Sequence, residues 1–260
     1  MPSTQVLPIW RYHAVRQLRS TSTWIMIIII LVMAGTQGLV TDHMPQIMKS
    51  LAGPEMSQML ASTMPEPSWQ QAYAGWMKNL AQIITLALIT INAIGYATLT
   101  NNGDIPFILT KNVKRSIYLT TGTITTWCAS LVYAVLGATL TWIGTMLIFP
   151  RAPYLPVFLA SLVWALEMML ISAFQLFAAT FKQGIGGPLL AGMGFYLLIS
   201  IAGVFEKIAT YTPLGLSRLS NQISEQQSVN NWFIPVGSAL LLLSVMFLLS
   251  IHRFNRKELS

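Results

Sequence analysis

Six long runs of apolar residues, separated by short polar segments, dominate this chain. They cover about residues 24–40, 80–100, 117–149, 157–180, 188–205 and 232–251. A helix that crosses the hydrocarbon core of a membrane needs about 20 mostly apolar residues. The pattern therefore predicts an all-α integral membrane protein with six transmembrane helices, in a single domain over residues 1–260.

Two segments outside these runs also show helical periodicity. Four apolar residues of the N-terminal leader share one helical stripe: Leu7, Trp10, Ala14 and Leu18. They predict an N-terminal helix that lies in the membrane interface. After the first run, apolar residues at helical spacing over 44–51 and 56–64 predict two short amphipathic helices on the outer surface. A Met-rich loop is the alternative there.

Composition supports the membrane class. Apolar residues make up 54% of the chain and charged residues only 9%, against roughly 45–50% and about 25% in soluble domains. So little charge argues against a soluble enzyme, and so many apolar residues exclude a disordered chain. The single Cys128 excludes a disulfide scaffold. The net charge of +7 lies in loops beside the apolar runs, so no nucleic acid is expected as a partner.

The basic residues predict the orientation of the helices. With six spans, one side carries ten Lys and Arg residues: Arg11, Arg16, Arg19, Lys111, Lys114, Arg115, Lys182, Arg253, Arg256 and Lys257. The other side carries five: Lys49, Lys78, Arg151, Lys207 and Arg218. Because cytoplasmic loops are enriched in Lys and Arg, we expect a multi-pass cell-membrane protein with both termini in the cytoplasm.

A secretory signal peptide is the competing interpretation of the first run. Its charged leader of 23 residues is long for a signal peptide, and no A-x-A cleavage site follows. We therefore expect an uncleaved first span.

Glu167 is the one acidic residue inside a predicted span. A carboxylate at the centre of a membrane helix is costly, so we expect it to face protein or water. Gln175 lies eight residues further on, about 80° round the helix. Both are candidates for a substrate path or a gate, and an interhelical hydrogen bond is the alternative for Glu167.

Small residues recur at helical spacing in two of the spans. The third span has Gly137, Thr141 and Thr145, and the fifth has Gly187, Ala191 and Gly194. Such stripes let helices approach closely in a membrane. We expect both to be packing surfaces, and we expect the same of Asn92 and Gly95 in the second span.

Motifs for enzymatic chemistry are absent from the sequence. It contains no G-x-x-x-x-G-K-[ST], H-E-x-x-H, C-x-x-C or G-x-S-x-G. The three histidines offer too few ligands for a metal site. We therefore expect no catalytic residues, no metal and no cofactor bound directly by this chain.

The loop between the second and third spans, G-D-I-P-F-I-L-T-K-N-V-K-R over 103–115, is the most specific segment. Asp104 can cap a helix there, and Pro106 suits a first turn. Phe107 and Ile108 are too apolar for water, while the basic residues can reach lipid phosphates. This predicts a short amphipathic helix on the inner membrane surface; an extension of the third span is the alternative.

This loop resembles the signature of type-2 ABC exporter permeases, roughly G-T-hydrophobic-x-x-L-L-[ST]-x-P-[VI]-x-R. Five positions match: Gly103, Leu109, Thr110, Val113 and Arg115. Asp104 stands in place of the usual Thr, and Asn112 in place of the usual Pro. The layout is also similar, with an interfacial N-terminal helix, six spans and a sizeable outer segment, here 206–231, that often forms short helices in the family.

The resemblance implies a permease subunit of a bacterial ATP-driven exporter. Such subunits form the substrate pathway as a dimer with a second copy or a homologue, and they dock two ABC ATPase subunits that bind ATP and Mg. The residues implied in ATPase coupling are Gly103, Asp104, Pro106, Phe107, Ile108, Lys111 and Arg115. The alternative function is a non-transporting membrane protein, such as an immunity or sensor protein.

Overall fold

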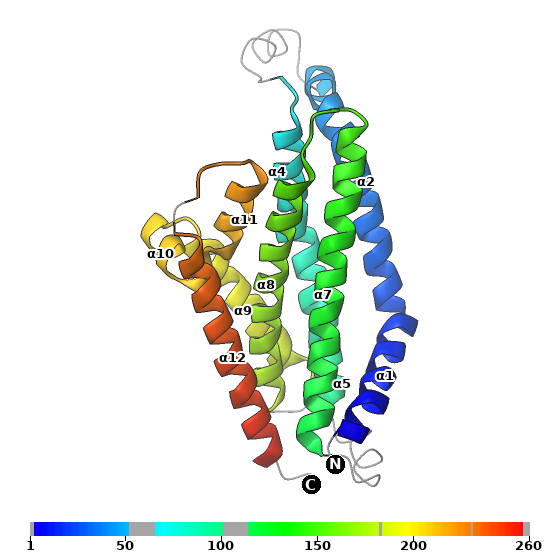
Figure 1. Ribbon diagram of the computed structural model, residues 1–260, viewed down its shortest axis with the longest axis vertical. Coiled ribbons are helices and arrows are strands. Elements are labelled where there is room, and N and C mark those ends of the chain that lie inside the picture. Colours follow the sequence, from blue (N-terminus) through cyan, green and yellow to red (C-terminus); the bar gives the residue numbers. More distant parts are fainter. Residues whose placement is uncertain (1–2, 52–65, 101–113, 182–183, 230, 257–260) are drawn as a thin grey trace.

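The computed structural model describes residues 3–51, 66–100, 114–181, 184–229 and 231–256, and every regular element in these ranges is a helix (Figure 1). Five helical stretches among them are long and apolar enough to cross a membrane: Thr21–Met48, Trp69–Thr100, Arg115–Met146, Tyr154–Ala179 and Phe233–Arg256. They correspond to five of the six predicted runs. The protein is therefore all-α with several membrane-spanning candidates, as its hydropathy predicts.

The second stretch consists of three consecutive elements. Helix α4 (Trp69–Asn79) leads into a π-helical turn, η1 (Leu80–Ile84), and then into α5 (Thr85–Thr100). It begins earlier than the predicted start at about 80, because Ser68 caps α4 by accepting a hydrogen bond from the N–H of Gln71. The apolar face of α4, including Tyr73 and Trp76, is fully buried, although its polar face interrupts the run in the sequence.

The first spanning helix is longer than predicted. Helix α2 (Thr21–Leu51) continues without a break through 44–51, so the separate short helix expected there is wrong. A side-chain hydrogen bond holds the middle of α2 against the end of α4: Asn79 Nδ2 donates to Gln37 Oε1 over 2.9 Å. Residues 56–64, the second expected short helix, lie outside the described residues.

The predicted fifth span is short. Helix α9 (Gly186–Ala202) has 17 residues and is about 26 Å long at 1.5 Å per residue, less than the roughly 30 Å of a bilayer core. The structure therefore does not show a sixth helix of spanning length at 188–205. Helix α9 ends at Gly203, whose N–H bonds to the carbonyl of Ile199 over 2.9 Å.

Short helices follow α9, as expected for 206–231. They are α10 (Glu206–Tyr211), a 3₁₀ turn η2 (Pro213–Gly215) and α11 (Leu216–Ser224). Helix α11 contacts α8 (Tyr154–Ala179) and α4, with Leu216 and Leu219 buried. Thr212 accepts a hydrogen bond from the N–H of Leu214, which shapes the turn between α10 and α11. The bundle is thus completed beyond the end of α9 by a buried helix that is too short to span.

Both ends of the described chain lie at the same end of the bundle (Figure 1). Helix α1 (Ser3–Arg19) packs there against α7 (Arg115–Met146) and α2. The predicted N-terminal helix is therefore present, and its place in a membrane interface stays a prediction.

Helix α8 (Tyr154–Ala179) is the centre of the fold. It contacts α4, α5, α7, α9, α11 and α12 (Phe233–Arg256). Three tryptophan N–H groups form hydrogen bonds between helices: Trp76 to Ser161 Oγ (3.3 Å), Trp164 to Thr85 Oγ1 (2.9 Å) and Trp127 to Ser172 Oγ (2.7 Å). A buried indole N–H needs an acceptor, so these pairs determine how α8 is seated against α4, α5 and α7.

Close helix contact confirms the packing surface predicted on the third span. A Cβ on Gly38 of α2 would lie 2.6 Å from the carbonyl oxygen of Gly144 of α7, and a Cβ on Gly137 would overlap the ring of Trp76. Neither position has room for a side chain. Helix α2 therefore needs glycine at position 38 to pack on α7, and α7 needs glycine at position 137 to pack on Trp76 of α4.

The packing surface predicted on the fifth span is wrong. A Cβ on Gly194 would meet nothing within 4 Å, and one on Gly187 would meet only an ordinary contact at 3.7 Å. The close approach is instead at Gly192, where a Cβ would lie 2.6 Å from Gln175 Nε2. The spacing of small residues along α9 could not identify Gly192, because the residue that approaches it, Gln175, belongs to another helix.

Candidate functional site

Most of the residues implied in ATPase coupling lie outside the described residues: Gly103, Asp104, Pro106, Phe107, Ile108 and Lys111. Arg115 is the first residue of α7 and is half-buried. The beginning of α7 lies at the end of the bundle that also holds α1 (Figure 1). The predicted coupling helix therefore stays a prediction.

Glu167 faces the protein interior, as expected from its cost in lipid. It lies on α8 and is only 2% exposed. Within the described part of the chain, its carboxyl group has no hydrogen bond or ion pair. The structural alternative, a hydrogen bond from Glu167 to another helix, is therefore not found among the described residues. The carboxyl group is a buried polar point in the most enclosed helix of the bundle.

Gln175 has a clear packing role. Its Nε2 donates to the backbone carbonyl of Ile89 on α5 over 2.7 Å, and the side chain is fully buried against Gly192 of α9. It lies eight residues from Glu167, about 12 Å along the helix axis. The two residues therefore do not form one polar cluster, and Gln175 joins α8 to α5.

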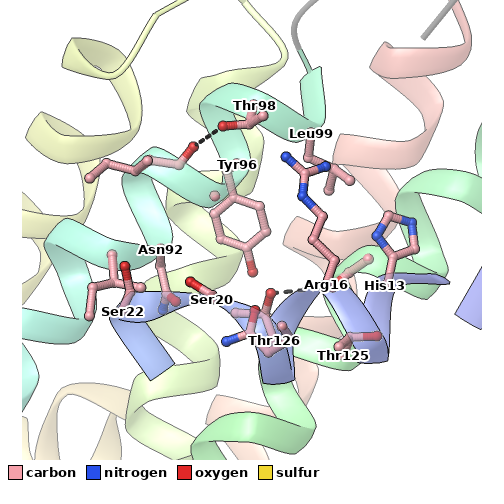
Figure 2. Close-up of a pocket in the computed structure, with 15 residues that line it drawn as sticks. His13, Arg16, Ser20, Ser22, Asn92, Tyr96, Thr98, Leu99, Thr125 and Thr126 are labelled. Carbon is pink, nitrogen blue, oxygen red and sulfur yellow. Dashed lines mark hydrogen bonds between the residues drawn. The ribbon is translucent and has the colours of Figure 1, made fainter. Parts of the chain in front are cut away.

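A polar cavity that the sequence analysis did not predict lies between α1, α5 and α7 (Figure 2). Its volume is about 200 Å³. Its polar lining includes His13, Arg16, Gln17, Asn92, Tyr96 and Thr126. Asn92 and Gly95, which were expected only to pack helices together, both line this cavity.

Several polar groups on the cavity wall are buried without partners. The atoms are His13 Nε2, Asn92 Nδ2 and the hydroxyl of Tyr96, and none has a hydrogen bond of standard geometry within the described chain. The hydroxyls of Thr126 and Ser172 lie close to Tyr96, but each donates to a carbonyl of its own helix. Buried polar atoms usually have partners, so these three atoms are unusual for the interior of a helical bundle.

The imidazole of His13 is held neutral by its surroundings. It is 6% exposed and packs against the ring of Tyr118 of α7, with centroids 4.9 Å apart. The pKa of His13 is lowered to about 4, mainly by burial and also by the positive charge of Arg16, while a backbone hydrogen bond with Tyr118 opposes the shift. Protonation of His13 is therefore coupled to the packing of α1 on α7.

Acidification is expected to destabilise this contact. A histidine with a lowered pKa in the folded state binds fewer protons than in the unfolded state, so stability is lost as the pH falls below about 6.5. Between pH 7 and pH 5 the loss is about 2 kcal/mol. It should appear as a lower melting temperature of the detergent-purified protein at pH 5. His13→Gln should remove most of this pH dependence.

The control is His252→Gln, since His252 is exposed on α12. It should keep the pH dependence of the parent protein. Equal pH dependence in both variants would contradict the role of His13.

Two further observations complete the description of the site. Among the described residues, no group of three or more His, Cys, Asp or Glu side chains could hold a metal ion. Comparison with known proteins finds no matching family model and no matching curated protein. A functional assignment therefore depends on the chain's own sequence and geometry.

Proposed function

We propose that this protein is the membrane permease subunit of an ATP-driven ABC exporter. The observation that carries the proposal is the order of its helices. An N-terminal helix precedes the apolar helices, and two short helices, α10 and α11, stand between α9 and α12. This order agrees with the layout implied by the inner loop's resemblance to type-2 ABC exporter permeases.

The proposal includes partners that supply the energy. The sequence has no P-loop of its own, so ATP and Mg would be bound by two separate ATPase subunits. A second permease copy or a homologue would complete the substrate pathway. The inner loop, with Phe107 and Ile108 as apolar anchors in a groove of the ATPase, would transmit the motion of the ATPases to the spans.

The orientation follows from charge. Ten of the Lys and Arg residues assigned to loops and termini would be cytoplasmic if both termini are inside, against five outside. The shared position of the two chain ends in the bundle agrees with this arrangement (Figure 1). The protein would thus lie in a bacterial cell membrane with its inner loop facing the ATPases.

Purification from the native cell tests this function. The tagged protein is expected to retain an ATPase with measurable hydrolysis in detergent. Phe107→Ala combined with Ile108→Ala should reduce the bound ATPase by about tenfold, because buried apolar anchors carry most of the energy of an interface. The amounts of permease and ATPase are compared on the same gel.

The matched control is Leu240→Ala combined with Leu241→Ala, on the exposed face of α12. It should leave the bound ATPase unchanged. If the inner-loop variant keeps its ATPase and exports normally, the coupling role is refuted. If no ATPase is retained by the parent protein, the non-transporting alternative is favoured instead.

A further inference from the structure

An apolar groove and a polar pocket adjoin each other beside α11. The groove lies between α8, α11 and the beginning of α12, and its volume is about 440 Å³. Its described lining is entirely apolar and includes Leu159 and Leu166 of α8. The polar pocket, of about 260 Å³, lies between α10, α11 and the segment before α12. Three residues line both spaces, Leu219, Val229 and Trp232, so the groove and the pocket are neighbouring parts of one site.

The site joins a lipid-facing surface to a polar one. Helices α10 and α11 and the beginning of α12 lie together on one side of the bundle, away from the end that holds both termini (Figure 1). Leu159, on the wall of the groove, is 40% exposed, and an apolar side chain exposed on a membrane-spanning helix contacts lipid. Trp232 is 57% exposed between groove and pocket, and tryptophan is typical of the boundary between membrane and water. The shape therefore fits an amphipathic molecule, with its apolar chain in the groove and its head in the pocket.

The polar pocket carries one charge of each sign. Arg218 Nη2 donates to Glu206 Oε1 over 3.3 Å, and the two side chains are 34% and 79% exposed. This contact uses one of the five N–H groups of the guanidinium, and both side chains are accessible to a ligand. An ion pair with this exposure is weak, so a bound head can pair with both charges at little cost.

A head that itself carries both charges complements this pair. A phosphate accepts hydrogen bonds from a guanidinium. An ammonium group pairs with a carboxylate and is attracted to the face of a tryptophan ring. A purely anionic head would gain Arg218 but would be repelled by Glu206, and a purely cationic head would meet the reverse. The charges of the pocket therefore favour a zwitterionic head over a singly charged one.

We propose that this site binds one zwitterionic amphiphile, with its phosphate at Arg218, its ammonium group at Glu206 and Trp232, and its apolar chain in the groove between α8, α11 and α12. A pocket of several hundred Å³ with apolar walls and a few polar groups at one end is typical of a small-molecule site. The site does not depend on the proposed transport function.

The test counts bound amphiphiles by native mass spectrometry of the full-length protein in a non-ionic detergent. The probes are lysophosphatidylcholine and lysophosphatidylglycerol with the same acyl chain, so they differ only in the head. We expect one molecule of the zwitterionic probe per chain, bound about threefold or more tightly than the anionic probe. Arg218→Gln should weaken the binding of the zwitterionic probe by a similar factor, because its phosphate loses the guanidinium.

Glu206→Gln tests the choice of head. The change removes both the attraction for an ammonium group and the repulsion of an anionic head, so lysophosphatidylglycerol should bind at least as tightly as lysophosphatidylcholine. Asp42→Asn makes the same charge change at an exposed carboxylate of α2, outside the site. It should keep the preference of the parent protein. A general loss of stability would not change the preference between the two probes.

Leu159→Trp tests the groove, with Leu155→Trp as its matched control. Both leucines lie on α8 and are exposed, by 40% and 61%, but only Leu159 is in the lining of the groove. The larger side chain should weaken the binding of both probes by at least about tenfold, because several methylene groups of the chain lose their apolar contacts. Leu155→Trp should bind like the parent protein. Both variants should melt at the parent's temperature without amphiphile.

Each outcome decides the proposal. A preference for the zwitterionic probe that is lost in Glu206→Gln, together with weaker binding in Leu159→Trp alone, supports it. Equal binding of the two probes by the parent protein, an unchanged preference in Glu206→Gln, or equal binding in Leu159→Trp and Leu155→Trp overturns it. A parent protein that is dimeric in detergent and becomes monomeric in Leu159→Trp assigns the groove to a second copy of the chain, which also overturns it.

Discussion

Gly215→Ala is expected to destabilise the protein by at least about 3 kcal/mol, at the upper end of the cost of overpacking. A Cβ at this position would overlap the backbone carbonyl of Ala209. Both atoms belong to the main chain, so the clash cannot be relieved by turning a side chain. Gly215 has φ −87°, which any residue can adopt, so the effect comes from lack of space. Helix α10 and the turn η2 would have to separate.

The expected measurement is the melting temperature in detergent, together with the yield of monodisperse protein on gel filtration. Gly194→Ala and Gly237→Ala make the same chemical change where a Cβ would meet nothing within 4 Å. Both should be neutral or stabilising by up to about 1 kcal/mol, because alanine favours a helix more than glycine does. If Gly215→Ala is as stable as these two variants, the close contact between α10 and η2 does not exist.

Glu167→Leu is expected to retain or raise stability while it impairs the proposed transport. The carboxyl group is 2% exposed and has no hydrogen-bond partner in the described chain, so its burial carries a cost that leucine removes. A buried polar group without a hydrogen-bond partner costs about 1–3 kcal/mol, so its replacement by an apolar residue of similar size is expected to be neutral or stabilising. A buried group that costs stability and is nevertheless present is typical of a functional position.

The melting temperature and the rate of ATP hydrolysis by the purified complex measure the two effects. Glu167→Gln keeps the shape and removes the charge, so it distinguishes a role of the carboxylate from a role of polarity. Gln175→Leu serves as the structural comparison and should lower stability, because it removes the hydrogen bond that Gln175 Nε2 donates to the carbonyl of Ile89. A loss of stability in Glu167→Leu without a change in hydrolysis would show that the carboxyl group has only a structural role.

Local features of the sequence determined the class of the protein and most of its helices. The length and hydropathy of a run are properties of consecutive residues, and they predicted five stretches that the structure also has. The cost of a carboxyl group in lipid predicted that Glu167 is buried. Prediction was less accurate at helix ends. Residues 44–51 continue α2, although Met44, Ile47 and Met48 are exposed. Helix α4 begins at Trp69, before the apolar run, because its apolar face packs on neighbouring helices.

Only the tertiary structure decided which residues meet across helices. The stripe of Gly187, Ala191 and Gly194 has the spacing of a packing surface, yet Gly192 makes the close contact, since Gln175 of another helix lies opposite it. The polar cavity brings together α1, α5 and α7, and the sequence indicated only Asn92 and Gly95 of its lining, as packing residues. Periodicity shows which face of a helix is apolar, but the partner opposite each residue depends on how the helices cross, which is set by side chains far apart in the chain.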